Sequence, residues 1–435
     1  MVEKCRPVAN PDDLFEILQA SRSIARHGVV FARCRSKGAV RLLARRETNS
    51  VTTPTYGNVL RDRFLLQSDA TYLNHGGFGA TPIEVLAAQS EWRARMEAQP
   101  ARFMSTELPP ALAAAATELA DFLGAEPADL AFIENATAGC NAVLRSLRLG
   151  PGDEVLINDH IYPAVRNVAR HVCAQSGATL VEAILPFPVT EPGAVVSALA
   201  AKLSDRTRVA VIDLITSHTA TILPVAEFAL AARAAGARLL VDAAHAPGHI
   251  ELDLPALGAD WVTGNAHKWL FAPKGCAFLW ADRAAQAGLH PTVISHGYGK
   301  GFKAEFAWTG TRDPSSWLAV TAAIGFYRRH GDRALRAHNH ELARRAGEML
   351  AEALGSELSA PASMRGAMAA LALPIAGPVD LDAAKLFHER LWQRHRIEVP
   401  VNAFAGRLWL RICAQIYNEM AEYERLAAAL RAELG

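Results

Sequence analysis

The chain has 435 residues, of which 51% are hydrophobic, and its formal net charge is +1. This length exceeds one ordinary core, so two packed lobes are expected, and the balanced charge argues against bulk binding to nucleic acid or a membrane surface. No apolar run approaches the ~20 residues of a membrane-spanning helix. The six cysteines are scattered without a CxxC pair, which is typical of reduced thiols in a cytoplasmic protein.

Residues 1–68 are interpreted as an N-terminal extension that we expect to be poorly ordered. From Ile17 to Arg46 the chain carries many basic side chains and no acidic one. This pattern is compatible with a basic arm, which would bind nucleic acid in a salt-dependent way, or with an organelle transit peptide. A poorly ordered extension or an upstream start codon explains it as well, and we favour that interpretation.

Two later stretches predict a strand that turns directly into a helix. Tyr72–Pro82 is a short strand, a glycine-rich turn and a helix start with a proline near its first turn. In the second stretch, the apolar run Leu130–Glu134 is followed by the small residues Asn135–Gly139. Free backbone N–H groups at such a helix start form a natural phosphate cradle, to which Thr137 can add its hydroxyl. A simple helix cap is the alternative interpretation.

The middle of the chain alternates between strands and helices, which predicts a parallel, doubly wound sheet. Gly275–Trp280 is the strand expected to close that sheet in the antiparallel direction. Past Gly331 the pattern changes to a mixed small domain, with helices expected at Arg333–Leu354 and Leu381–His395 and strands at Ala367–Leu373 and Leu408–Cys413. We therefore expect a large domain over residues 69–315, whose first segment contributes to the small domain, and a small domain over residues 316–435.

Two neighbouring stretches carry the chemistry. Leu239–Gly248 begins as an apolar strand that ends in Asp242, and Thr263–Trp269 carries Lys268. An acid at the carboxyl end of one strand and a lysine just past the next face the same crevice of an open sheet. The pair suits pyridoxal phosphate (PLP), whose aldehyde forms a Schiff base with a lysine and whose ring nitrogen pairs with an acid. Burial and nearby positive groups should lower the pKa of Lys268, which helps it act as a base.

With these motifs in this order, the chain resembles the class V aminotransferase-fold PLP enzymes, and within them the isopenicillin-N epimerase-like branch. The resemblance runs from about Tyr72 to the C-terminus. It implies the α/β architecture of PLP fold type I, which is aspartate-aminotransferase-like. That fold has a large domain with a mainly parallel seven-stranded sheet and a smaller α+β C-terminal domain.

The resemblance also implies roles around the cofactor. Lys268 carries the Schiff base, Asp242 pairs with the ring nitrogen, and His245 hydrogen-bonds the phenolic oxygen or the substrate. His160 is expected to stack on the ring; Tyr162 is the alternative, and it could instead be an acid–base group or a substrate contact. The residues expected to hold the phosphate are Ala136, Thr137, Asn265 and His267.

Thr311 lies in the stretch Trp308–Pro314, which resembles the family motif G-T-x-D. In the family this threonine reaches across a two-fold interface to the phosphate of the partner's cofactor. The resemblance therefore implies a homodimer in which each site needs both copies. A turn that caps the following helix, expected from Ser315 to Arg329, is the alternative.

The expected partner is a small-molecule amino-acid substrate. Arg407–Asn418 resembles the family motif L-R-I-S-x-x-x-Y-N, with Cys413 in place of the serine, and Arg411 is the candidate clamp for the α-carboxylate. A structural arginine paired with an acid is the alternative. Three residues of the glycine-rich turn are expected at the substrate mouth: Asn74, His75 and Gly76. Ser217 or His218 is a further candidate to contact the ring or the substrate, and Arg102 either faces a substrate carboxylate or lies on the surface. No metal site is expected.

The substrate is expected first to displace Lys268 from the cofactor, and the freed Lys268, or a partner base, then removes the Cα proton. The branch favours an epimerase; the alternatives are a C–S lyase of the hercynylcysteine sulfoxide lyase kind, an aminotransferase, or a PLP-fold binding protein without activity. The last is disfavoured because both Lys268 and Asp242 are present. A persulfide-forming cysteine desulfurase is not expected, since no cysteine lies between Cys276 and Cys413. The sequence does not identify the substrate.

Overall fold

The computed structural model describes residues 55–376 and 379–435 of the chain, so the basic stretch Ile17–Arg46 lies outside the described residues. Packed structure begins before residue 68, where we had placed the end of the extension. The backbone N–H of Gly57 donates to the carbonyl of Ile416 at 2.7 Å. Phe64 is buried in the core. The sequence did not reveal this packing, because the neighbouring 3₁₀ turn Asn58–Arg63 is charged and is typical of a solvent-exposed segment.

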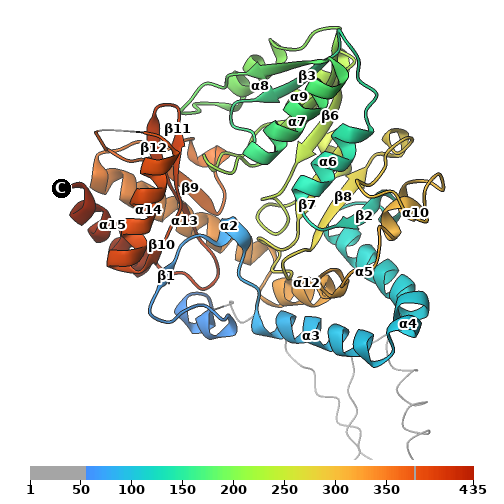
Figure 1. Cartoon of the computed structure of the whole chain (residues 1–435). Helices are drawn as coiled ribbons and strands as arrows, with labels where there is room; N and C mark the ends of the chain where they lie inside the picture. The colour runs from blue at the N-terminus through green and yellow to red at the C-terminus, as the bar shows by residue number, and fades with distance from the viewer. Residues whose placement is uncertain (1–54, 377–378) are drawn as a thin grey trace, which may run out of the picture. The chain divides into compact units, whose positions relative to one another are not determined.

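A seven-stranded sheet forms the centre of the large domain, in the order β2-β8-β7-β6-β5-β3-β4 (Figure 1). Its strands are parallel except β8, which runs antiparallel to both β2 and β7 and so confirms the predicted closing strand. The strands are β2 (Leu130–Ile133), β3 (Glu154–Asn158), β4 (Thr179–Ala183), β5 (Thr207–Asp213), β6 (Arg238–Asp242), β7 (Trp261–Asn265) and β8 (Ala277–Ala281).

Helices cover both faces of this sheet, as near-continuous apolar strands require. On β5, Val209 and Val211 belong to the core on the side of α6 (Ala136–Ser146) and α7 (Pro163–Ser176). Ala210 and Ile212 point the other way, because successive side chains of a strand alternate between faces. The helices on that second face include α5 (Leu108–Phe122), α8 (Pro192–Ala200), α9 (Val225–Ala234) and α12 (Val320–Arg329).

The predicted helix Ser315–Arg329 is broken into α11 (Ser315–Leu318) and α12, and α12 packs on α3 and α5 of the large domain. The predicted boundary at residue 316 stays a prediction, although α12, which follows it, packs on helices of the large domain. The remaining elements of the large domain are α2 (His75–Phe78), α3 (Ile83–Ala98), α4 (Pro100–Arg102), the π-helical turn η2 (Phe103–Glu107), α10 (Phe302–Ala307) and the 3₁₀ turns η3 (Pro127–Asp129), η4 (Pro255–Leu257) and η5 (Arg283–Ala285).

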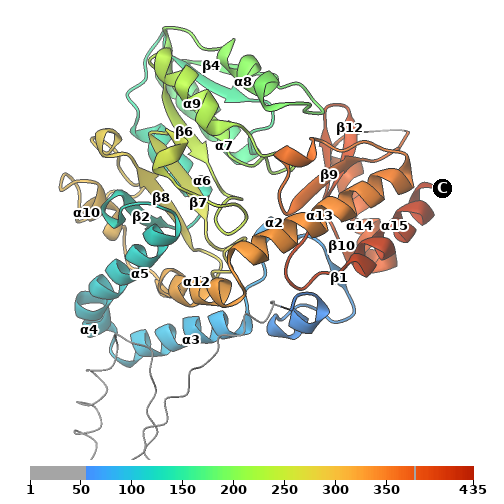
Figure 2. The same cartoon turned by 180° about the vertical axis from the view of Figure 1, so that it is seen from behind.

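The small domain contains an antiparallel sheet in the order β11-β12-β9, seen in orange and red in Figure 2. A second, two-stranded sheet joins β1 near the start of the described chain to β10 in parallel. This pairing brings the segment just before α2 beside the small domain. The elements are β1 (Thr71–Tyr72), α13 (Arg333–Leu354), η6 (Ala362–Met364), β9 (Met368–Ala372), α14 (Leu381–His395), β10 (Ile397–Glu398), β11 (Val401–Phe404), β12 (Arg407–Cys413) and α15 (Met420–Leu434).

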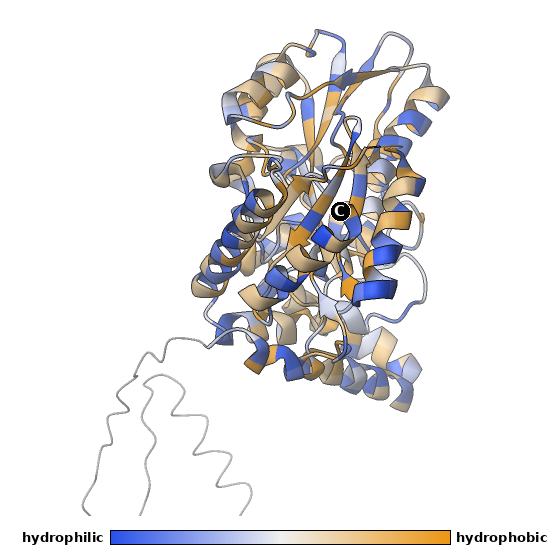
Figure 3. Cartoon of the chain, turned by 90° about the vertical axis from the view of Figure 1, so that its left-hand side faces the viewer, coloured by the Kyte–Doolittle hydropathy of each residue, from blue (hydrophilic) through white to orange (hydrophobic). Residues whose placement is uncertain are grey.

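Helices at the surface mix hydrophilic and hydrophobic residues along their length, as expected when one stripe is buried and the other meets water (Figure 3). Within residues 55–376 and 379–435, no helix is both long and apolar enough to cross a lipid bilayer.

Candidate active site

Two aspartates stand side by side where β5 and β6 end. Asp213 and Asp242 are register partners on these parallel strands, and both are buried. Burial raises the pKa of both carboxyls, and the charge of Asp242 raises that of Asp213 further. Asp242 accepts the backbone N–H of Ala244 at 2.9 Å and faces the positive charge of Lys268, both of which favour its ionised form. We therefore expect Asp242 to carry the charge and Asp213 to hold a proton.

Lys268 lies just past the end of β7 and its side chain meets His245. The Lys268 Nζ is 3.1 Å from Nε2 of His245. Burial, followed by the charge of Arg411, lowers the pKa of Lys268 to about 8. Trp269 Nε1 can only donate, and its contact with His245 Nδ1 at 3.4 Å leaves the ring hydrogen on Nε2. A neutral His245 that donates from Nε2 pairs with a neutral lysine amine, the form that acts as nucleophile or base.

His75 is buried and contacts the backbone of Lys268. Its ring is 1% exposed, Nδ1 lies 2.8 Å from the hydroxyl of Tyr417, and Nε2 lies 3.0 Å from the carbonyl of Lys268. Burial lowers the pKa of His75 to about 3, so the ring is neutral. Both ring nitrogens of His75 are engaged inside the protein, so the predicted substrate contact of His75 stays a prediction.

Gly76 is also buried and is not at a substrate surface. Its N–H donates to Cys413 Sγ at 3.3 Å, which agrees with a packing role for that cysteine. A Cβ at Gly76 would lie 2.9 Å from Met368 Sδ, so a larger residue would not fit without a shift. Of the three residues predicted at the mouth, only Asn74 makes a polar contact with the candidate carboxylate clamp.

That clamp is Arg411 on β12, which is 5% exposed. Its Nη1 donates to the carbonyl of Ser217 at 2.5 Å and its Nη2 to Asn74 Oδ1 at 3.0 Å. The buried Nε has no partner among the described residues. A guanidinium has five N–H groups, so it keeps donors for a carboxylate after these two bonds. Arg411 is thus held in place by polar groups without being neutralised by an acid.

The start of α6 is organised by side chains from two directions. Asn135 caps the helix and accepts the N–H of Ala138 at 2.9 Å. Asn265 Oδ1 accepts the N–H of Ala136 at 2.9 Å, so these two predicted phosphate residues are engaged with each other. Thr137 follows in the first turn. Nδ1 of His267 lies 3.1 Å from the carbonyl of Cys276, which leaves its Nε2 available.

His160 is much more deeply buried than Tyr162, the alternative ring-stacking residue. His160 is 4% exposed, while Tyr162 is 40% exposed. His160 Nδ1 lies 2.8 Å from the hydroxyl of Thr219, and its buried Nε2 has no partner among the described residues. Burial lowers the pKa of His160 to about 4, so the ring is neutral. This burial favours His160 for the predicted role.

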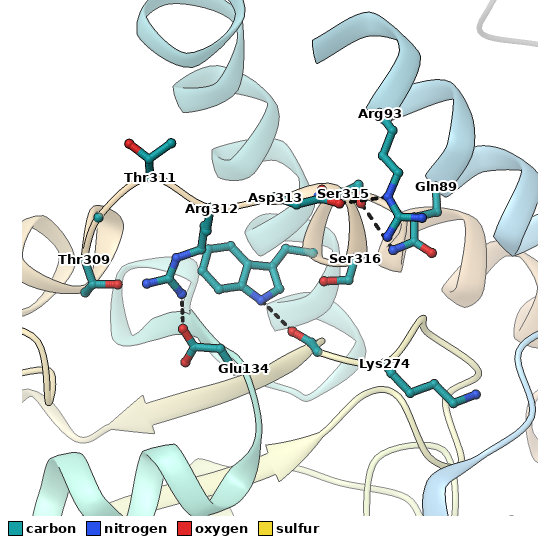
Figure 4. Close-up of a pocket in the computed structure, with 13 residues that line it drawn as sticks. Gln89, Arg93, Glu134, Lys274, Thr309, Thr311, Arg312, Asp313, Ser315 and Ser316 are labelled. Carbon is teal, nitrogen blue, oxygen red and sulfur yellow. Dashed lines mark hydrogen bonds and ion pairs between the residues drawn. The ribbon is translucent and has the colours of Figure 1, made fainter. Parts of the chain in front are cut away.

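Thr311 lies apart from Lys268, on the loop that borders a cavity of about 470 Å³ (Figure 4). Arg312 forms an ion pair with Glu134 there. Nothing in a single chain brings Thr311 to Lys268, so its service to a partner's cofactor stays a prediction. Arg102 is not brought to the site either: its side chain is 70% exposed and its nearest acid is Glu107 at 3.9 Å. The surface alternative therefore holds for Arg102 within one chain.

These residues fit pyridoxal phosphate. Asp242 offers a buried carboxylate for the ring nitrogen and Lys268 an amine for the aldehyde. In the first turn of α6, where the N–H groups of Ala136 and Ala138 are already engaged, Thr137 offers its backbone N–H and its hydroxyl for a phosphate. The orphaned Nε2 of His160 is a further polar atom that a ligand could satisfy. Sequence reasoning missed Asp213; the available signal was its place at the end of the strand expected beside Asp242.

Known proteins match most of this chain. The model of the family "Aminotransferase class-V" matches residues 71–389. Isopenicillin N epimerase of Streptomyces clavuligerus is 36% identical over 393 residues, which cover 86% of this chain and 98% of that protein. "Putative L-cysteine desulfhydrase 1" of Oryza sativa subsp. japonica is 34% identical over 394 residues, 82% of each. The solved structure of a C-DES mutant, with glycine covalently linked to its PLP cofactor, matches with a TM-score of 0.71 at 22% identity. The match covers 86% of this chain and 99% of that one, so the two proteins share the fold.

Proposed function

The chain belongs to the class V aminotransferase family, and from this premise we propose that it is a PLP-dependent enzyme that epimerises an α-amino acid at Cα. The proposal rests mainly on the contact between Lys268 Nζ and the neutral His245 at 3.1 Å. The same site contains Arg411, which keeps N–H groups free for a substrate carboxylate. Likeness to isopenicillin N epimerase, at 36% identity over 98% of that protein, supports epimerisation.

Pyridoxal phosphate, when bound, supplies an electron sink that stabilises negative charge at Cα. Arg411 binds the α-carboxylate and so fixes which bond of Cα faces Lys268. Lys268, whose pKa is lowered to about 8, gives up its proton more readily than an ordinary lysine, and its neutral form takes the Cα proton. The Nε2–H of His245 holds the lysine amine in place before that step. Asp242 offers its charge where the ring nitrogen would lie.

A β-elimination that releases sulfide is the second candidate, because the L-cysteine desulfhydrase relative covers 82% of this chain. In that reaction cysteine and water give pyruvate, ammonia and hydrogen sulfide, and the Cα proton is again lost to Lys268. Persulfide transfer is not proposed. The four described cysteines are buried, and burial raises the pKa of each thiol, so none is placed as an exposed thiolate nucleophile.

The test compares wild type with Lys268→Ala, and with Lys274→Ala as a matched control. Lys274 is also partly buried and donates to Thr81 Oγ1 at 3.4 Å, but it lies on the cavity away from His245. L- and D-amino acids, L-cysteine among them, are incubated with each protein in D₂O. Epimerisation predicts deuterium at Cα and appearance of the opposite enantiomer in wild type and Lys274→Ala, but not in Lys268→Ala.

Sulfide with pyruvate would instead select the lyase, and a keto acid without sulfide would select an aminotransferase. Each of these results overturns epimerisation. If wild type lacks the absorbance of lysine-bound PLP after incubation with the cofactor, the enzyme assignment fails and a binding protein of this fold is favoured.

We also propose a cytoplasmic homodimer in which Thr311 serves the partner's site. Supporting this, Thr311 is exposed on the border of the cavity in Figure 4. A second, mostly apolar hollow of about 720 Å³ lies between α5 and α10 and includes Trp308 just before that loop. Apolar surface of this kind is typical of areas that an interface covers.

A further inference from the structure

A chain of hydrogen bonds leads from Arg411 to the outside of the small domain. Arg411 Nη2 donates to Asn74 Oδ1 at 3.0 Å, and Asn74 Nδ2 donates to Glu398 Oε1 at 2.9 Å. Glu398 Oε2 then lies 3.0 Å from Nε2 of His388. The four side chains come from β12, the turn before α2, β10 and α14, so they meet only in the folded protein.

The direction of this chain is determined by Glu398. An amide has an oxygen that accepts and a nitrogen that donates, and Asn74 could turn either group toward Arg411. A carboxylate only accepts, so Glu398 requires the amide nitrogen, and the amide oxygen is left facing the guanidinium. The reversed amide would point N–H groups at Arg411 and carbonyl oxygen at Glu398, leaving both contacts unfavourable.

Glu398 is ionised in this position. Burial raises the pKa of its carboxyl, but the hydrogen bonds from His388 and Asn74 more than offset burial, so the pKa lies below its usual value. His388 benefits in turn, since its bond to Glu398 raises the pKa of the imidazole. The acceptor character of Glu398 toward Asn74 is therefore kept at neutral pH.

The backbone does not need the Glu398 side chain to bring these elements together. Tyr72 and Glu398 are register partners of β1 and β10, and the N–H of Leu73 donates to the carbonyl of Glu398 at 2.9 Å. Removing the carboxylate leaves that pairing in place. Its effect should then fall on the orientation of Asn74 and, through it, on Arg411.

We propose that Glu398 is a positioning residue for carboxylate recognition: it fixes the Asn74 amide, which holds the Arg411 guanidinium with its remaining N–H groups free for the substrate carboxylate. This inference rests on the proposed function, since it needs Arg411 to be the clamp. It adds a residue that never touches substrate yet sets how well a carboxylate is bound.

The experiment uses two probes that react with the bound cofactor through the same oxyamine group. Aminooxyacetate carries a carboxylate, and O-methylhydroxylamine does not. The loss of cofactor absorbance gives the half-saturating concentration of each probe with the holoenzyme. The effect reaches the probe only through Asn74 and Arg411, so we expect it to be worth about one ordinary hydrogen bond. Glu398→Ala should therefore weaken aminooxyacetate about fivefold to tenfold and leave O-methylhydroxylamine unchanged. Glu398→Gln can still present an acceptor to Asn74 and should restore binding to within about twofold.

Glu433→Ala is the matched control, because Glu433 pairs with His395 at 3.0 Å in the same domain but does not touch Asn74. It should leave both probes unchanged. Arg411→Ala should weaken aminooxyacetate more than Glu398→Ala does. Asn74→Ala removes the same contact from another element and should reproduce the Glu398→Ala ratio.

The outcomes separate the two proposals. If Arg411→Ala does not change the ratio of the two probes, the clamp itself is wrong and the proposed function loses its substrate contact. If Arg411→Ala changes the ratio but Glu398→Ala and Asn74→Ala do not, only the positioning role is overturned. Equal weakening of both probes by Glu398→Ala also overturns it, since a general structural defect would not discriminate. Should Glu398→Ala fail to fold, Asn74→Ala decides alone.

Discussion

Gly79 lies where α2 ends, directly against the backbone of His267 and Lys268. Its φ is 74° and its ψ 152°, a region that is essentially restricted to glycine. A Cβ there would lie 2.2 Å from the carbonyl oxygen of His267 and 3.0 Å from Cα of Lys268. Gly79→Ala should therefore cost roughly 1–3 kcal/mol for the backbone conformation and roughly 1–3 kcal/mol more for overpacking. Because the obstructing atoms are backbone, relief must come from displacing Lys268.

Gly236→Ala is the control for this prediction. Gly236 has a φ of 75°, but a Cβ there would meet no atom within 4 Å, so only the positive φ is penalised, by roughly 1–2 kcal/mol. Thermal unfolding with and without added cofactor compares the two variants, and the absorbance of bound cofactor reports on Lys268. Gly79→Ala should unfold at a lower temperature than Gly236→Ala and hold the cofactor more weakly. Equal unfolding temperatures together with unchanged cofactor affinity would refute the steric argument.

Three further predictions concern protons and the partner subunit. Uptake of PLP by the apoenzyme should become faster as pH rises, with a midpoint near 8, because the pKa of Lys268 is lowered to about 8 and only the neutral amine attacks the cofactor. Stopped-flow absorbance measures this rate. A midpoint near the usual lysine value of 10.5 would contradict the prediction. In the folded protein the pKa of His75 is lowered to about 3 and that of His160 to about 4, so both rings stay neutral while the same residues of the unfolded chain protonate near 6.5. Acidification from pH 7 to pH 5 should therefore lower the free energy of unfolding by about 2 kcal/mol for each histidine. A melting temperature that does not change over this range would contradict the prediction that the rings are buried and neutral. If Thr311 serves the partner's site, Thr311→Ala should weaken cofactor binding. In a mixed dimer of one Thr311→Ala subunit and one Lys268→Ala subunit, the site that keeps Lys268 receives an intact Thr311 from its partner and should regain normal cofactor affinity. An equilibrium titration that finds no such recovery would argue against a shared site.

Much of the fold could be predicted because its signals are local. Apolar runs mark the strands of the seven-stranded sheet, and helices α13 and α14 have the predicted bounds, Arg333–Leu354 and Leu381–His395. The motifs that contain Asp242 and Lys268 could also be recognised, because the carboxyl ends of neighbouring parallel strands lie at the same edge of a sheet. The break between α11 and α12 could not, because their residues continue a helical pattern across it.

Contacts within the site were less predictable. His75 and Gly76 belong to the same turn as Asn74, yet His75 faces Tyr417 and only Asn74 faces Arg411. A motif shows that a turn is present but not which of its side chains points inward. Asn265 was expected to hold phosphate, and its oxygen instead accepts the N–H of Ala136. These differences depend on side-chain direction, which neighbouring elements decide.

The sequence by itself determined the family and the cofactor, because each depends on motifs whose residues lie close together along the chain. Only the tertiary structure decided how the carboxylate clamp is held. Arg411 and Asn74 are 337 residues apart, and Asn74 and Glu398 are 324 apart. No local pattern can encode such a pairing, since it exists only once β1 pairs with β10 and the small-domain sheet brings Arg411 to the turn before α2.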